Sequence, residues 1–287
     1  MVRRWTAAVT AVLAVLALAC EGGTEGGPPS RPPGSPRPGL PSSIAALGDS
    51  ITTGFGSCLV LAACQRNSWA TGGSTRVDSL YRRLLEANPS IRGHAHNLAA
   101  NGARAADLAG QARDAVRAGV DYVTVLVGAN DACRSRVEDM TEVATFREQL
   151  DRALRVIREE RPRAQVLVLS IPDLYRLWEI GHTDPRAVRA WGNRICPALL
   201  ANATSTAEAD QTRRSTFRAR IDAYNRELAA ACRAYGSRCR HDGGAVHRVR
   251  FSLDMVNQVD YFHPDTDGQN ELARVAWRAS GLARRTD

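Results

Sequence analysis

The stretch SIAALGDS at residues 43–50 decides the fold, because it joins a short apolar run to a glycine and a serine. The run at 43–47 has the length and composition of a buried strand. Gly48 permits a tight turn and a close approach of the backbone. In parallel α/β sheets, ligands bind outside the carboxyl ends of the strands. Ser50, directly after the strand, therefore lies where a side chain can act on a ligand.

Similar short runs, apolar or β-branched, recur along the chain and alternate with longer amphipathic stretches. The predicted strands are residues 43–47, 95–99, 122–127, 165–171 and 246–251. Helices are expected at about residues 77–87, 105–118, 142–160, 212–235 and 268–282. This alternation is typical of an α/β protein with a mainly parallel sheet.

The longest segment without a predicted strand, residues 172–209, mixes Trp178 and Trp191 with prolines and small polar residues. Loops of this length inside a compact domain are usually functional or tied down. We expect Cys196 to tie the segment, and the tryptophans to help form the wall of a cleft.

Composition indicates one ordinary globular domain that does not bind nucleic acid. The 287 residues can bury a full core, and the 44% hydrophobic and 24% charged contents are ordinary for a soluble protein. The net charge of +8 comes entirely from arginine, since no lysine is present. These arginines are scattered among Glu and Asp rather than clustered, so DNA or RNA binding is not expected.

The first 20 residues have the features of an export signal. Arg3 and Arg4 supply a positive start, and the uncharged run from Trp5 to Ala19 is too short to span a membrane comfortably. Two processing outcomes stay open, because residues 17–19 fit an ordinary cleavage site while Cys20 resembles the lipid-modified cysteine of bacterial lipoproteins. The position of Cys20 favours lipidation, although its preceding residues depart from the usual lipobox.

A Gly/Pro/Ser-rich stretch at residues 21–41 follows and is predicted to be a flexible tether. The folded domain is then expected to span residues 42–287. We predict an exported protein, either extracellular or anchored to the outer face of the cell membrane. Membrane association would come only through a lipid at Cys20, and a monomer is expected.

The remaining six cysteines are an even number, which suggests three disulfides in an exported chain. They are Cys58, Cys64, Cys133, Cys196, Cys232 and Cys239. Sequence alone permits 15 pairings. Two short spacings would let the first two and the last two close small loops, which would leave the middle pair to each other. No C-x-x-C pair occurs, so no metal site is predicted.

A second motif, DYFHP at residues 260–264, places an acid three residues before a histidine. A serine hydroxyl needs a base within hydrogen-bond reach, and that imidazole needs a carboxylate to set its tautomer. Ser50, His263 and Asp260 are therefore candidates for nucleophile, general base and orienting acid. Taken singly, each motif has a plainer interpretation: a helix cap at Asp49 or Ser50, and a surface histidine beside a capping acid.

Two further segments could supply the donors that an oxyanion needs in acyl transfer. Gly102 follows the predicted strand at 95–99 and could offer its backbone N–H, and Asn130 follows the strand at 122–127 and could offer its side-chain amide. Each also fits a simple turn, in which glycine shapes the backbone or Asn130-Asp131 bonds its own loop.

Together the four segments resemble one family, the SGNH hydrolases, also called GDSL esterases and lipases. The match consists of Gly48-Asp49-Ser50, Gly102, Gly128-Ala129-Asn130-Asp131 and Asp260-x-x-His263, in that order. The six cysteines and the segment WGNRICP at residues 191–197 resemble the exported actinobacterial members.

The resemblance implies a three-layer, flavodoxin-like α/β/α sandwich with a five-stranded, mainly parallel sheet. It implies that Ser50 attacks a carboxylic ester, that His263 takes the proton and that Asp260 orients His263. The Ser50 and Gly102 backbone N–H groups and the Asn130 amide would hold the oxyanion. No metal or organic cofactor is implied, and the substrate would be a small-molecule, lipid or acylated-carbohydrate ester.

Other classes of protein are less well supported. An ordinary α/β-hydrolase would carry a G-x-S-x-G elbow, which is absent from this sequence. Residues 241–247, with two histidines and an aspartate, fit no metal-ligand spacing and are predicted to form a solvated turn around Gly243-Gly244. A non-catalytic, surface-tethered module that binds a polysaccharide or lipid through the same cleft remains an alternative.

Overall fold

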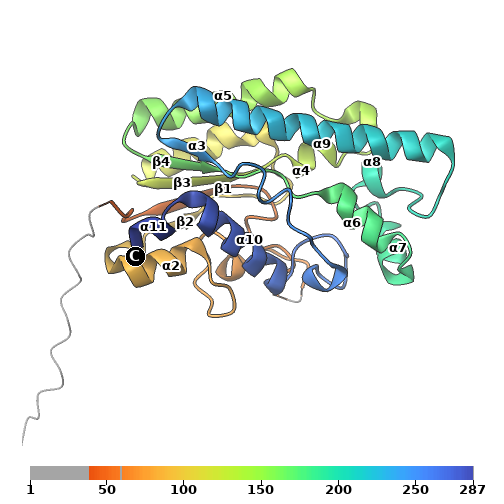
Figure 1. The fold of residues 1–287 in the computed structure, drawn as a ribbon, viewed down its shortest axis with the longest axis horizontal. Helices are drawn as coiled ribbons and strands as arrows, with labels where there is room; N and C mark the ends of the chain where they lie inside the picture. The colour runs from red at the N-terminus through yellow and green to blue at the C-terminus, as the bar shows by residue number, and fades with distance from the viewer. Residues whose placement is uncertain (1–38, 59, 287) are drawn as a thin grey trace, which may run out of the picture. The chain divides into compact units, whose positions relative to one another are not determined.

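Five parallel strands form the sheet, in the order that flavodoxin-like folds share (Figure 1). The computed structural model describes residues 39–58 and 60–286. Along the chain the strands are β1 (Ile44–Gly48), β2 (Ala95–Asn97), β3 (Tyr122–Leu126), β4 (Gln165–Val168) and β5 (Cys239–His241). In space their order is β2-β1-β3-β4-β5, and every neighbouring pair is parallel.

Helices cover both faces of this sheet. They are α2 (Leu80–Ala87), α3 (Leu108–Arg117), α5 (Val143–Glu160), α9 (Glu208–Tyr235) and α10 (Thr266–Ser280). Helices α3, α5 and α9 lie on one face, and α2 and α10 lie on the other (Figure 1). The predicted fold class, a three-layer α/β/α sandwich with a five-stranded parallel sheet, is confirmed.

Shorter helical segments connect these elements. The α-helical ones are α4 (Ala129–Ala132), α6 (Leu174–Gly181), α7 (Pro185–Trp191), α8 (Pro197–Leu200) and α11 (Ala283–Thr286). The 3-10 turns are η1 (Gln65–Asn67), η2 (Pro89–Ile91), η3 (Ala105–Asp107), η4 (Val137–Asp139) and η5 (Leu253–Met255). Several of them lie at the carboxyl ends of the strands, where the predicted site residues also lie.

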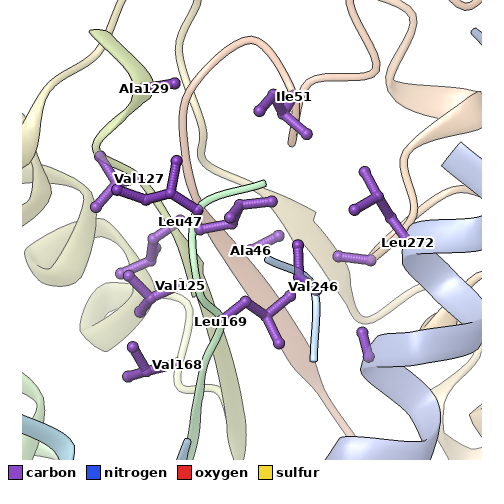
Figure 2. Packing of buried hydrophobic residues seen from close by; sticks show 14 of the residues in the cluster. Ala46, Leu47, Ile51, Val125, Val127, Ala129, Val168, Leu169, Val246 and Leu272 are labelled. Atoms are coloured by element: carbon purple, nitrogen blue, oxygen red, sulfur yellow. The ribbon is translucent and has the colours of Figure 1, made fainter. Parts of the chain in front are cut away.

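The core is centred on β1 and β3, whose residues are all buried. Strands covered on both faces are near-continuous apolar runs, which is why the sequence shows them so clearly. Figure 2 shows Leu47, Val125 and Leu169 packed in this core. Gly48 ends β1 with φ +147°, and a Cβ atom there would lie 2.2 Å from the Leu126 carbonyl oxygen. Only glycine fits where β1 ends beside β3.

The fifth strand lies elsewhere than predicted. Strand β5 has three residues and no apolar pattern, so it gives no strand signal of its own. It pairs with β4, and the Cys232–Cys239 disulfide ties it to the end of α9. The predicted strand at 246–251 is wrong, because those residues form turns and irregular backbone. Val246 and Phe251 are nevertheless buried (Figure 2 shows Val246), so their apolar pattern reflects burial without pairing.

The segment 172–209, expected to lack regular structure, contains three short helices, α6, α7 and α8. Asp173 and Asp184 cap the first two helices with their carboxylates, and prolines begin α7 and α8. These helices are too short to show a clear helical period. The predicted tie is present, since Cys196 forms a disulfide with Cys133, three residues beyond Asn130.

The other two disulfides join Cys58 to Cys64 and Cys232 to Cys239. This is the pairing that the short spacings favoured. The predicted export signal at residues 1–20, the candidate lipidation site Cys20 and the tether up to residue 38 lie outside the described residues. In the described part of the chain, no helix is both long enough and apolar enough to cross a membrane.

Candidate active site

The turn that carries Ser50 starts where β1 ends and is held by hydrogen bonds of Asp49. The Asp49 carbonyl accepts from the N–H groups of Thr52 and Thr53, each at 3.0 Å, and its carboxylate accepts from the Ile51 N–H at 2.9 Å. No regular helix follows, so Ser50 does not serve as a helix cap. The strand end and this turn fix the direction of the Ser50 side chain.

His263 reaches Ser50 from 213 residues further along the chain. Its Nε2 lies 2.9 Å from the Ser50 hydroxyl, and its Nδ1 lies 2.7 Å from Oδ2 of Asp260. The other carboxylate oxygen of Asp260 accepts the backbone N–H groups of Phe262 and His263. The side chains of His263 and Asp260 are 18% and 6% exposed, so this chain of hydrogen bonds is largely shielded from water.

Asn257 holds the loop that carries His263. Its backbone N–H donates to the His263 carbonyl at 2.8 Å, and its side-chain oxygen accepts the N–H groups of Val259 and Asp260. Tyr261 adopts a left-handed conformation with φ +52°, uncommon for a residue other than glycine. The indole Nε1 of Trp191 donates to the Tyr261 carbonyl at 3.0 Å and fixes that turn from the side of α7.

Gly102 and Asn130 lie on adjoining segments that the structure links to the end of β1. The Ala100 N–H donates to the Gly48 carbonyl at 3.2 Å, which places the Gly102 turn beside the Ser50 turn. One proton of the Asn130 amide donates to the Ala103 carbonyl at 3.1 Å, which leaves the amide's second proton for a ligand. Within residues 39–58 and 60–286, neither the Ser50 N–H nor the Gly102 N–H has a hydrogen-bond acceptor.

All five predicted site residues therefore gather at the carboxyl ends of β1 and β3. This is the point where the strand order reverses, and it is where open α/β sheets bind their ligands. Residues 46–270 match the model of the GDSL-like lipase/acylhydrolase family. The chain belongs to this family. The matched range includes all four motif segments, so the resemblance to the GDSL, or SGNH, hydrolases is confirmed.

Curated relatives of this GDSL family member include two mammalian enzymes. The chain is 30% identical over 172 residues to the membrane-associated phospholipase B1 of Homo sapiens and 28% identical over 212 residues to that of Rattus norvegicus. The matches cover 50% and 61% of this chain but 12% and 14% of the relatives. The chain thus spans a small part of the relatives' length.

Solved structures with the same fold include a phospholipase A1 from Streptomyces albidoflavus, with a TM-score of 0.50 and 18% identity. The match covers 83% of this chain and 98% of that one. A variant of an acetyl-xylooligosaccharide esterase from Geobacillus has a TM-score of 0.51 and 18% identity. That match covers 83% of this chain and 94% of the esterase chain. At these identities the likeness shows the fold alone.

Three supporting residues of this GDSL site were missed by the sequence analysis. Gln111 of α3 clamps Gly48 with two hydrogen bonds, accepting from its N–H at 2.7 Å and donating to its carbonyl at 2.9 Å. Gln269 of α10 donates to the Ile51 carbonyl and accepts the Trp69 N–H, both at 2.9 Å. Asn257 is the third. For the two glutamines, the signal in the sequence was a polar residue among the apolar residues on the buried faces of α3 and α10.

Two buried carboxyl groups belong to the segments of the candidate site, Asp49 next to Ser50 and Asp131 next to Asn130. Burial raises the pKa of Asp49 from 3.8 to about 7, although the Ile51 N–H and the nearby His263 act in the opposite direction. Burial also raises the pKa of Asp131. Asp131 accepts the Ala105 N–H at 3.0 Å and the Thr141 hydroxyl at 2.9 Å, which joins the Gly102 segment to α4 and thus to Asn130.

The predicted solvated turn at residues 241–247 is only partly solvated. Gly243 and Gly244 do form a turn, but Asp242 is buried and accepts the Ser170 hydroxyl at 2.7 Å and the Val246 N–H at 2.9 Å. These bonds attach the turn to the end of β4. In the described part of the chain, no group of three or more His, Cys, Asp or Glu side chains is arranged to hold a metal ion.

Proposed function

We propose that the chain is a carboxylic ester hydrolase in which Ser50 is the nucleophile, His263 the general base and Asp260 the residue that orients His263. The observation that carries the proposal is the continuous pair of hydrogen bonds, 2.9 Å from Ser50 to His263 and 2.7 Å from His263 to Asp260. A serine, a histidine and a buried carboxylate in this relation are the groups that acyl transfer requires.

In the first half of the reaction, the Ser50 oxygen attacks the ester carbonyl carbon while its proton passes to Nε2 of His263. The imidazolium then gives that proton to the alcohol oxygen as the carbon–oxygen bond breaks, which leaves an acyl group on Ser50. Asp260 accepts the Nδ1–H and stabilises the imidazolium. In the second half, water attacks the acyl-serine by the same proton path and releases the acid.

The negative charge that forms on the carbonyl oxygen needs preorganised donors. Three groups would serve: the Ser50 N–H, the Gly102 N–H and the second proton of the Asn130 amide. Support comes from the lack of acceptors for the two backbone groups among the described residues, and from the Ala103 carbonyl that aligns Asn130. Asp131 would keep the Gly102 and Asn130 segments in register.

The relatives leave two classes of substrate open. Phospholipase B1 points to lipid esters, and the acetyl-xylooligosaccharide esterase points to acetylated carbohydrates. We also propose that the protein is exported, because the six cysteines at positions 58–239 all form disulfides, which persist in oxidising compartments. Lipidation of Cys20 stays a prediction.

Covalent labelling with an organophosphonate serine probe tests the nucleophile directly. The wild-type protein should be labelled once, and Ser50→Ala should lose the label together with turnover of p-nitrophenyl esters. His263→Ala should label much more slowly, since Ser50 would lack its base. Intact-mass spectrometry measures the label.

Ser135→Ala is the matched control, because Ser135 is exposed but has no histidine partner among the residues that the structure describes. This variant should be labelled like the wild type. Folded wild-type protein that takes no label and hydrolyses no ester would overturn the proposal and favour the non-catalytic binding module.

A further inference from the structure

A partly enclosed, mostly apolar cavity adjoins the candidate site. Ser50, His263 and Asn130 of that site contribute to its lining. The remaining lining is mostly apolar: Ile51, Ala129, Pro172, Leu174, Leu177, Phe251, Val256, Phe262 and Pro264, together with Asp173. Its volume is about 30 Å³. A larger hollow of about 900 Å³ between α8 and α9 is lined by neither Ser50 nor His263, so it does not bear on the reaction.

We infer that this cavity binds the acyl half of the substrate and that it admits only short acyl groups, of about two to four carbons. The inference rests on the proposed function and narrows it. Among the two open substrate classes, it favours acetylated or other short-chain esters over long-chain lipids.

The acyl half fits this cavity better than the alcohol half for two reasons. The alcohol of a carbohydrate or glycerophosphate ester carries hydroxyl or charged groups, and these would lose hydrogen bonds among apolar side chains. The alcohol also leaves after the first half of the reaction, whereas the acyl group stays on Ser50 until water attacks. An apolar, partly enclosed pocket suits the group that stays.

The size of the cavity limits the length of the acyl chain. A single water-sized group needs roughly 10–15 Å³ of such space, so about 30 Å³ holds about two methyl- or methylene-sized groups beyond the carbonyl. A longer chain that stayed inside the cavity would have to displace residues such as Leu177 or Phe251, which are only 5% and 8% exposed. Well-packed side chains resist displacement of this kind.

The wall that Leu177 forms is held in place from several sides. Helix α6 carries Leu177, and the Trp178 indole on the same helix donates to the Ala203 carbonyl at 2.8 Å. Gly181, at the end of α6, lies against the Trp191 ring so closely that a Cβ atom there would be 2.4 Å from it. Trp191 in turn holds the loop of His263. The pocket is therefore braced against widening.

A series of p-nitrophenyl esters with acyl chains of two, four, eight and twelve carbons tests the inference. For the wild-type protein, kcat/KM should be highest for the two- and four-carbon esters and lower for the eight-carbon ester by about tenfold or more, within the range seen when a pocket excludes methylene groups. Leu177→Ala removes three carbons from the wall and should shift the preference toward eight carbons, reducing that ratio at least about tenfold.

Leu154→Ala is the matched control, since Leu154 lies on α5, is similarly buried at 3% exposure and does not line the cavity. It should keep the wild-type order of substrates. The milder Leu177→Val serves if the alanine variant fails to fold. Wild-type preference for eight or twelve carbons, or an unchanged ratio in a folded Leu177 variant, would overturn the inference while leaving the hydrolase intact. A folded wild-type protein that took no serine probe and hydrolysed no ester would instead overturn the proposed function.

Discussion

The two sides of the site are built by different means. On one side, Ser50, Gly102 and Asn130 follow β1, β2 and β3, and backbone hydrogen bonds between neighbouring strand ends fix them. On the other side, Leu177 lies on α6 in the segment that follows β4, and His263 lies in the loop between β5 and α10; we call these two segments together the excursion. That excursion is fixed by caps, indole hydrogen bonds and the Cys133–Cys196 disulfide.

Under the proposed function, this difference implies that the strand side sets the chemistry and the excursion side sets the choice of substrate. Strand ends in a buried parallel sheet cannot move without breaking the core, so they suit groups that must hold an oxyanion. An excursion held by side chains can vary in length and shape while the sheet stays unchanged. We expect substitutions on the strand side to change kcat most, and those on the excursion side to change specificity and stability.

The largest expected effect is on the strand side. Asn130→Ala removes an amide that the proposal directs at the oxyanion, and loss of one such donor lowers kcat by about 10²- to 10³-fold. Steady-state kinetics with p-nitrophenyl acetate measures this change. KM should change little, because the donor acts mainly on the charge that forms during the reaction.

Asn193→Ala is a suitable control, since Asn193 is exposed at the end of α7 and should leave kcat unchanged. Turnover by folded Asn130→Ala at the wild-type rate would show that the amide does not bind the oxyanion. The assignment of chemistry to the strand side would then rest on Ser50 and Gly102.

The same contrast explains what could be predicted from sequence. Ser50 and Asn130 follow fully buried strands, whose apolar runs are easy to recognise in the sequence. The motif at 260–264 holds an acid and a histidine within one loop. Strand β5 has no such run, because its three residues are placed by pairing with β4 and by a disulfide to α9. Long-range contacts, rather than local pattern, decide its position.

The supporting residues were hidden for a related reason. A glutamine such as Gln111 looks like any polar residue on a helix until the strand end that it clamps is known to lie opposite. Asn257 and Trp191 support His263 through backbone groups, which the sequence does not display. Helices α6 to α8 were missed because each is too short for its apolar period to show.

A smaller effect on turnover is expected on the excursion side. Trp191→Phe keeps the ring but leaves the buried Tyr261 carbonyl without its donor, which should lower the free energy of unfolding by about 1–3 kcal/mol. Because that carbonyl belongs to the turn before His263, kcat should also fall. The fall would be about tenfold if poorer positioning of His263 raises the activation free energy by about 1.4 kcal/mol. Urea unfolding and steady-state kinetics measure the two effects.

Trp178→Phe is a closely matched comparison, since its indole also donates to a backbone carbonyl, that of Ala203, away from His263. It should lose similar stability but keep more of its kcat. Equal loss of kcat in both variants would mean that the Trp191 bond supports the excursion as a whole and has no special part in placing His263.

The smallest expected effect concerns how stability depends on pH, and it separates Asp49 on the strand side from Asp184 on the excursion. Burial raises the pKa of Asp49 to about 7, above the ordinary value of 3.8. Between these values the folded protein keeps a proton that the unfolded chain has released, so the contribution of Asp49 to stability falls as the pH rises toward 7. Hydrogen bonds from Arg186 lower the pKa of Asp184 from 3.8 to about 2, so its contribution to stability stays constant above about pH 5.

Urea unfolding of the wild type, Asp49→Asn and Asp184→Asn at pH 5 and pH 8 tests this contrast. The wild type should lose stability relative to Asp49→Asn between the two pH values, because the variant never has to bury a carboxylate charge. The difference in the free energy of unfolding between the wild type and Asp184→Asn should be the same at pH 5 and pH 8. A wild-type advantage over Asp49→Asn that grew with pH would mean that the Asp49 carboxylate is stabilised by its neighbours, the Ile51 N–H foremost, more than burial penalises it.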